Sequence, residues 1–142
     1  MITRRYKKGD VYKIDVRGLY NPILEIEEAY TALDKIGCTF PCEVLEDNGE
    51  AICIILFKNI DTKDNYNGMV VLSNSFKPIH TKEIKKSIDK LCERLKVKEV
   101  VTYSLDIDTN NKWHRLLGFT DTGIETECFG YKHKLWKLVK EN

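Results

Sequence analysis

The sequence predicts an α/β protein in which residues 1–142 form one domain, with a mixed, mostly antiparallel sheet flanked by helices. The length of 142 residues, with 42% hydrophobic and 32% charged residues, suits one core under a solvated surface. Residues 81–96 carry apolar side chains at helical spacing and stand between two apolar strand candidates, which makes a βαβ unit. Asp47-Asn48-Gly49 separates two further strand candidates, and Asn-Gly is typical of a tight hairpin turn. Together these patterns favour a sheet with helices on its faces.

The N-terminal residues give weaker signals. Residues 2–6 alternate enough to predict a short strand, and Asp10 is placed to cap a helix. Residues 11–17 contain β-branched side chains at a spacing that leaves strand and helix open.

The first long helix is expected over residues 22–36. Asn21 can cap its start and Pro22 suits its first position, because proline lacks the N–H that a helix leaves unpaired there. Gly37 follows the last apolar residue of the stripe and is expected to end the helix.

Four strands are expected in the middle of the chain. Residues 39–46 and 51–58 flank the hairpin turn, and the second of these is almost continuously apolar, which is typical of a strand buried on both faces. Residues 69–72 predict another buried strand, and residues 98–105 follow the amphipathic helix. These last two strands are expected to lie parallel or to splay side by side.

The C-terminal part of the chain predicts a short helix over residues 110–117 that ends at Gly118. Residues 121–129 and 131–139 then predict a closing hairpin.

Charge and cysteine content exclude several classes of protein. Lys and Arg number 23 against 22 Asp and Glu, so the basic excess that drives phosphate binding is missing and a nucleic-acid module ranks well below the other functions. No apolar run approaches the roughly 20 residues that span a bilayer, and Met1 to Lys8 do not form a signal peptide. Five cysteines without a C-x-x-C pair argue against a disulfide framework and against a metal site, and favour the cytoplasm.

The order of the elements, together with residues 110–119, resembles the GCN5-related N-acetyltransferase (GNAT) superfamily. Residues 110–119 read Asn-Asn-Lys-Trp-His-Arg-Leu-Leu-Gly-Phe, and in that family an Asn opens a short helix that ends in Leu-Gly-Phe. A narrower similarity is to the GNAT-like proteins of short-tailed bacteriophages, which share the hairpin before the central strand and the basic start of the main helix. That similarity implies the host cytoplasm or the virion as the location.

The resemblance implies acetyl-coenzyme A (acetyl-CoA) as cofactor, bound in a V-shaped gap between residues 69–73 and 99–105. The backbone of Val71, Leu72 and Ser73 is expected to bond the pantetheine arm. Lys77, His80 and Thr81 are expected to hold phosphate, and Asn110 to contact the arm of the cofactor.

Two positions depart from the family pattern. Family members have glycines in the loop before the main helix, whereas residues 73–82 contain none, and Pro78 removes one N–H donor. The alternative for this segment is a plain connection in which Thr81 caps the helix. His114 stands where many members have a Tyr that protonates the coenzyme A thiolate, so it is either the catalytic acid or a packing residue.

The general base is left open by the sequence. Asp106, Asp108 and Glu25 are candidates because carboxylates near strand or helix ends suit that work, and each also suits a surface or capping position. Trp113 and Trp136 are expected in the core or in a cleft wall.

The sequence therefore leaves two functions. The first is an N-acetyltransferase that acts on a small-molecule or protein amine. The second is a non-catalytic GNAT-shaped protein, either a virion component or a binder of a phage or host protein, and the missing glycines motivate it.

Overall fold

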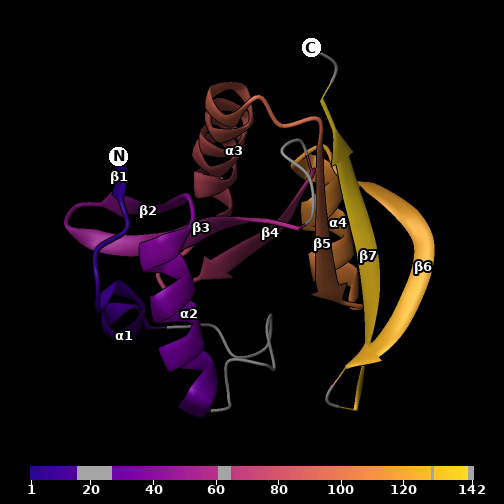
Figure 1. Cartoon of the computed structure of the whole chain (residues 1–142), viewed down its shortest axis with the longest axis horizontal. Helices are drawn as coiled ribbons and strands as arrows, with labels where there is room; N and C mark the ends of the chain where they lie inside the picture. Colours follow the sequence, from indigo (N-terminus) through magenta and orange to yellow (C-terminus); the bar gives the residue numbers. More distant parts are fainter. Residues whose placement is uncertain (16–26, 61–64, 129, 141–142) are drawn as a thin grey trace.

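A computed structural model describes residues 1–15, 27–60, 65–128 and 130–140, in which seven strands form one sheet (Figure 1). Their order across the sheet is β1-β2-β3-β4-β5-β7-β6. The strands are β1 (Ile2–Arg5), β2 (Cys42–Asp47), β3 (Glu50–Asn59), β4 (Asn65–Leu72), β5 (Glu99–Leu105), β6 (Thr120–Cys128) and β7 (Tyr131–Val139). Within this part of the chain, β4 and β5 run parallel and the other neighbouring strands run antiparallel. The mixed, mostly antiparallel sheet is therefore confirmed.

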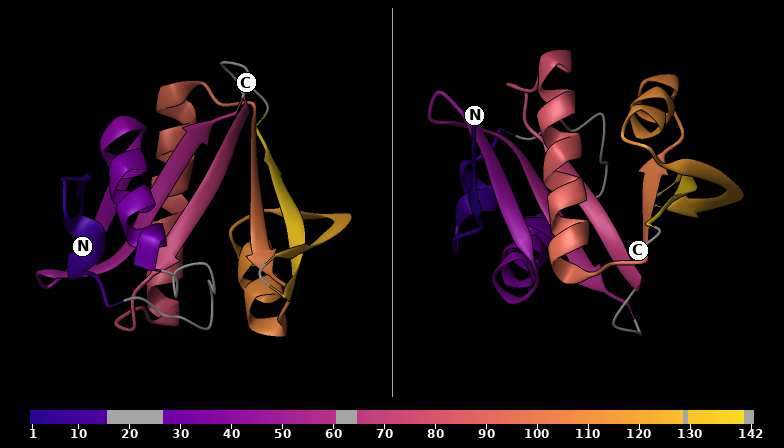
Figure 2. Two further views of the ribbon diagram at one scale, coloured as in Figure 1. Left: turned by 60° about the horizontal axis from the view of Figure 1, so that its bottom comes forward. Right: turned by 90° about the horizontal axis from the view of Figure 1, so that it is seen from above.

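Helices cover both faces of the sheet. The first face carries α1 (Asp10–Lys13) and α2 (Glu27–Thr39), and the second carries α3 (Thr81–Leu95) and α4 (Asp108–Leu116) (Figures 1 and 2). A 3₁₀ turn, η3 (Pro78–His80), leads into α3. Among the helices that the structure describes, none is long and apolar enough to cross a membrane.

Two hydrophobic clusters lie on opposite faces of the sheet. Ile84, Ile88 and Leu91 of α3 pack on one face, and the other face packs against α1 and α2. Every residue of β3 from 52 to 57 is buried, which confirms that this strand is central and covered on both sides. The amphipathic pattern of α3 and the continuous apolar pattern of β3 therefore have one cause, a sheet that is covered by helices on both faces.

The start of α1 differs from the expectation for Asp10. Gly9 precedes the helix with a φ of 91°, and Asp10 is the first helical residue. Its carboxylate accepts two hydrogen bonds from the guanidinium of Arg4, at 2.8 and 3.0 Å, and a third from the N–H of Lys7 at 2.6 Å. Asp10 therefore ties the first helix to β1 instead of capping it.

Gly37 does not end the second helix, which continues to Thr39. A Cβ atom on Gly37 would lie 2.9 Å from the ring of Tyr6, so glycine is needed here for close packing. The expected capping residues Asn21 and Pro22, and with them Glu25 and residues 16–26 as a whole, lie outside the described residues.

Local turn chemistry is confirmed in the β2–β3 hairpin, where Asn48 and Gly49 both have positive φ, 52° and 80°. The start of α3 is different: His80 precedes the helix, Thr81 is its first residue, and no side chain caps it. The fourth helix begins at Asp108, two residues before the expected start.

The two parallel strands pair over a short stretch and then separate. Asn65, Tyr66 and Asn67 of β4 lie opposite Glu99, Val100 and Val101 of β5. Beyond these pairs the strands diverge, as the left view of Figure 2 shows. At the point of divergence a Cβ atom on Gly68 would lie 2.7 Å from Cγ1 of Val100, which is fully buried. Glycine therefore allows the close approach from which the wedge opens.

Replacing Gly68 by Ala should reduce the free energy of unfolding by about 1–3 kcal/mol, because the added methyl group overpacks a contact that cannot relax into solvent. Urea denaturation at neutral pH measures the change. In a protein that already carries Val100→Ala, Gly68→Ala should cost less unfolding free energy than it does in the wild type, because the side chain that the new methyl group meets is smaller. A Gly68→Ala protein as stable as the wild type would show that the strands yield at this point.

The Tyr6 hydroxyl donates to Asp34 at 2.6 Å and accepts from the Val11 N–H at 3.1 Å. The Tyr6 bond, followed by the bond from Gly9, holds the pKa of Asp34 below 3.8. Because the folded pKa is depressed, this stabilisation is present above pH 3.8 and is lost as the pH falls through the lower folded value.

Tyr6→Phe should therefore lower the unfolding free energy by about 1–2 kcal/mol at neutral pH and by less in acid. Urea titrations at several pH values check this. Tyr12→Phe is the matched control, since the Tyr12 hydroxyl bonds Thr31 at the exposed surface. An equal loss for Tyr6→Phe at every pH would contradict the role given to Asp34.

Candidate active site

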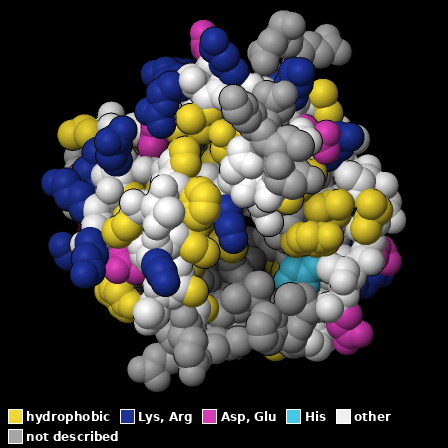
Figure 3. All heavy atoms as spheres, viewed as in Figure 1, with side chains coloured by type: hydrophobic (Ala, Val, Ile, Leu, Met, Phe, Trp, Pro, Cys, Tyr) yellow, Lys and Arg dark blue, Asp and Glu magenta, His cyan; other side chains and the backbone are white. Residues whose placement is uncertain are grey.

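A cleft of about 450 Å³ lies in the wedge between β4 and β5. Figure 3 shows the molecule hollowed near its centre, with histidine and hydrophobic side chains beside the hollow. Thr102 and Ser104 of β5 line the cleft from the α4 side, while Tyr103 and Leu105 alternate to the opposite face of the sheet. The cleft therefore passes through the sheet and reaches both faces.

Backbone groups point into this cleft from both walls. The N–H of Ser73 donates to the carbonyl of Ile52 at 2.9 Å, so Ser73 faces β3, and strand alternation turns Val71 the same way. The N–H and C=O of Leu72 consequently point toward the gap. Of the three residues expected to bond the cofactor through their backbone, Leu72 is the one that the register turns to the cleft.

The opposite wall is provided by β5. The N–H of Asp106 donates to the carbonyl of Lys132 at 2.9 Å, which fixes the alternation against β7. By that alternation the backbone of Tyr103 faces the gap, beyond the last residue paired with β4. Leu72 and Tyr103 thus present the donors and acceptors of two strands that have separated.

Asn110 lines the cleft from the first turns of α4 and is 3% exposed. Its side-chain NH₂ donates to the carbonyl of Leu105 at 3.3 Å, so the end of β5 fixes the side chain. The structure thus brings Asn110 to the same cavity as Leu72.

The two described carboxylates considered as the general base lie away from the cleft lining. The hydrogen bond from the Asn111 amide, at 2.9 Å, with Lys134 and Lys132 nearby, keeps the pKa of Asp106 below its usual value of 3.8. Asp106 is therefore a weak base in an ion-pair cluster. Asp108 is exposed at the start of α4.

His114 is buried in the wall of the cleft among aromatic rings. Its ring stacks on Trp136 with centroids 5.4 Å apart and meets the edges of Trp113 and Phe119. Nδ1 lies 2.7 Å from the carbonyl of Asn110, and since a carbonyl only accepts, Nδ1 carries the proton. Burial lowers the pKa of His114 below 6.5, which favours the neutral ring. In that form Nε2 is an acceptor, not a proton donor.

The loop before α3 is folded around His80. The N–H of Lys77 donates to Nδ1 at 2.9 Å, so Nε2 carries the proton and donates to Asp47 at 3.0 Å. His80 is 4% exposed, and both of its ring nitrogens are used inside the protein. The ring therefore holds the loop against the β2–β3 hairpin, while Lys77, Pro78 and Ile79 are exposed.

Trp113 separates this loop from the cleft. Its Nε1 donates to the hydroxyl of Thr81 at 3.3 Å, and its ring meets Phe76 edge-on at 5.9 Å. Residues 73–82, all of which the structure describes, are absent from the lining of the cleft. Lys77, His80 and Thr81 are therefore not brought together with Leu72 and Asn110.

Sequence reasoning missed His133 of β7, which also lines the cleft and is 4% exposed. No motif surrounds it, and its neighbours Leu105 and Thr126 come from other strands. The alternation within residues 131–139 was the one available signal, and it marks a face without naming a function.

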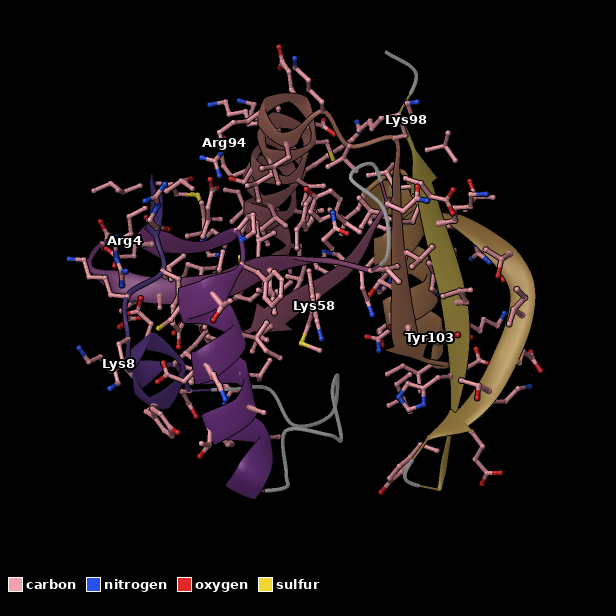
Figure 4. All side chains as sticks on the ribbon, viewed as in Figure 1. Arg4, Lys8, Lys58, Arg94, Lys98 and Tyr103 are labelled. Atoms are coloured by element: carbon pink, nitrogen blue, oxygen red, sulfur yellow. The ribbon has the colours of Figure 1, made fainter. Side chains whose placement is uncertain are left out.

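Among the described residues no Lys or Arg lines the cleft, and Glu127 is the charged residue that does. Figure 4 shows Arg4, Lys8, Arg94 and Lys98 at the periphery of the molecule, whereas Lys58 of β3 lies nearer its centre, with Nζ 5.8 Å from the centroid of the Phe40 ring. Nor does the described part of the chain contain a group of three or more side chains suited to a metal ion.

No protein-family model and no curated protein matches the sequence. Solved structures do match. A GNAT-family acetyltransferase of Bacillus anthracis has a TM-score of 0.71 at 12% identity, covering 96% of this chain and 93% of that one. Aminoglycoside 6'-acetyltransferase type Ii gives 0.74 at 10% identity, covering 98% and 97%.

A further match is a protein of Salmonella typhimurium solved with its cofactor acetyl-CoA. Its TM-score is 0.67 at 16% identity, covering 97% of this chain and 92% of that one. At such identities the likeness defines architecture. The chain has the fold of the GNAT acetyltransferases.

Proposed function

We propose that this protein is an acetyl-CoA-dependent N-acetyltransferase acting on an amine of a small molecule or protein. The observation that carries the proposal is the wedge: a cavity open to both faces of the sheet, with the backbone of Leu72 and Tyr103 turned into it. The pantetheine arm contains two amides, which can pair with these groups as a neighbouring strand would. Bound acetyl-CoA would supply the acetyl thioester.

Residues of the chain then have separate tasks. Leu72 and Asn110 position the arm, while the aromatic wall around His114 and Trp113 excludes water from the reacting carbonyl. The α1/α2 side of the cleft, at Tyr103 and Leu105, receives the amine. Location in the cytoplasm fits Cys38, Cys42, Cys53 and Cys92, which are free thiols.

The phosphate arm would lie at the N-terminus of α3, where the helix dipole favours anions. Lys77 supplies charge there, and Thr81 its hydroxyl once Trp113 releases it. In this proposal His80 shapes the loop and does not touch the phosphate, because its ring is already bonded on both sides.

Acetyl-CoA should bind with a dissociation constant in the micromolar range and change the fluorescence of Trp113, since its bond to Thr81 must break. Titration calorimetry and fluorescence measure this. Trp136→Phe should keep the fluorescence change, because Trp136 is fully buried outside the cleft.

Acetyl transfer is tested by the release of free thiol with spermidine, kanamycin, 2-phenylethylamine and an N-terminal alanine peptide as acceptors. Absence of binding at millimolar acetyl-CoA would exclude the enzyme.

The glycine-free, internally bonded loop favours the second candidate, a non-catalytic GNAT-shaped protein that binds a phage or host protein. Phe76 is buried and Trp113 bridges to Thr81, so the entrance for phosphate is closed in this conformation. Failure of acetyl-CoA to bind would support this candidate, and pull-downs from the native host would follow.

His114 should contribute packing and not proton donation. His114→Phe keeps a ring between Trp136 and Phe119, and its kcat should stay within about tenfold of the wild type, whereas loss of a general acid costs about 10²–10⁴-fold. Because the pKa of His114 lies below 6.5, the rate should show no fall above pH 6.5 from its deprotonation. A loss of 100-fold in His114→Phe would restore the acid role.

A further inference from the structure

His133 lies in a row of side chains across three strands at the open end of the wedge. Leu105 of β5 and Thr126 of β6 are its direct partners, and all three line the cleft. By strand alternation the row faces away from α4, on the α1/α2 side of the sheet. Tyr103, two residues from Leu105, is on the same side, and Figure 4 shows it beside β7.

The hydrogen bond of His133 fixes which of its nitrogens carries the proton. Nδ1 lies 2.9 Å from the carbonyl of Tyr131, and because the carbonyl can only accept, Nδ1 is the donor. In the neutral ring Nε2 then carries a lone pair, and this nitrogen has no hydrogen-bond partner among the described residues. A side chain that is 4% exposed, lines a cavity and has one basic nitrogen without a partner in the described part of the chain has the properties of a proton acceptor.

We propose that His133 is the general base, and that the acceptor is a primary amine on an apolar or aromatic body. The inference rests on the proposed acetyltransferase function and adds to it the base and the class of substrate. On the acceptor side the described lining offers Met69, Tyr103 and Leu105 as apolar and aromatic contacts, beside the polar Asn67, Thr126 and His133. No Lys or Arg is among the described lining residues, and nearby Lys58 is held over the ring of Phe40, so the lining itself places no cation against an ammonium group.

The proton and electron balance is complete. Nε2 of His133 takes one proton from the ammonium group, which leaves the nitrogen lone pair free. That nitrogen attacks the thioester carbon, the C–N bond forms, and the C–S bond breaks with its electron pair going to sulfur. The nitrogen then loses a second proton, which the thiolate takes up, while the first proton passes from His133 to solvent. The net reaction yields the amide, the free thiol and one proton.

The test compares the wild type with His133→Asn. The side-chain NH₂ of Asn can still donate to Tyr131, but it offers no basic nitrogen in place of Nε2. With 2-phenylethylamine at neutral pH, kcat/KM should fall by about 10²–10⁴-fold. The fluorines of 2,2-difluoro-2-phenylethylamine weaken the basicity of its amine. With this substrate the loss should be much smaller, because a larger share of the amine is already unprotonated at neutral pH and needs no base. A purely structural role would reduce both rates equally.

Two controls accompany this comparison. Acetyl-CoA should bind His133→Asn with a dissociation constant within about twofold of the wild type. Lys137→Asn changes the same strand and the same side of the sheet outside the cleft, and should leave both rates unchanged.

Each outcome has one meaning. Equal activity of His133→Asn and the wild type would overturn the base while leaving the acetyltransferase intact. Transfer to spermidine or kanamycin but not to 2-phenylethylamine would overturn the class of substrate. A wild type that binds acetyl-CoA yet acetylates no amine would remove the proposed function, and this inference with it.

Discussion

The close contact between β4 and β5 at Gly68 and Val100 is the constraint on which the rest of the site depends. Pairing of the strands over three residues joins the two halves of the sheet. Beyond it, each strand gives up ladder hydrogen bonds that a continuous sheet would keep. The unpaired backbone of Leu72 and Tyr103 is the direct result, so the cleft exists because the sheet is incomplete. A ligand that pairs with both strands would restore the hydrogen bonds that are lost where the strands separate.

The loop after β4 decides how such a ligand is received. In a glycine-rich loop, bare N–H groups approach phosphate directly. Here the loop is closed by its own side chains: His80 bonds the Lys77 N–H and Asp47, and Trp113 bonds Thr81. The Trp113 contact joins α3 and α4, whereas the His80 contacts lie within the loop and the β2–β3 hairpin that supports it. Under the proposed function, binding of the phosphate arm therefore requires movement of Trp113 and leaves the His80 contacts in place.

Local sequence patterns predicted the elements well, and long-range contacts explain what they missed. The Asn48-Gly49 turn and the apolar stripe of α3 depend on neighbours a few residues away, and both are found as expected. Gly37 was expected to stop a helix, but its role is to admit the ring of Tyr6, which is distant in sequence. Of the residues expected at the site, Asn110 and Leu72 line the cleft, whereas the fold turns His80 and Ser73 elsewhere. For His133 the alternation within residues 131–139 indicates a face of the strand but no function.

The two cleft histidines show why residue type alone does not assign a role. In His114 and His133 alike, Nδ1–H donates to a backbone carbonyl, so both rings have the same tautomer. His114 is enclosed by Trp136, Trp113 and Phe119 on the face of α4, where the expected task was to give a proton. His133 is on the opposite face, among residues that would meet an amine, where the task is to take one. A neutral imidazole with a free Nε2 lone pair meets the second requirement and fails the first. The chemistry of the site is therefore set by the face of the sheet from which each ring enters the wedge.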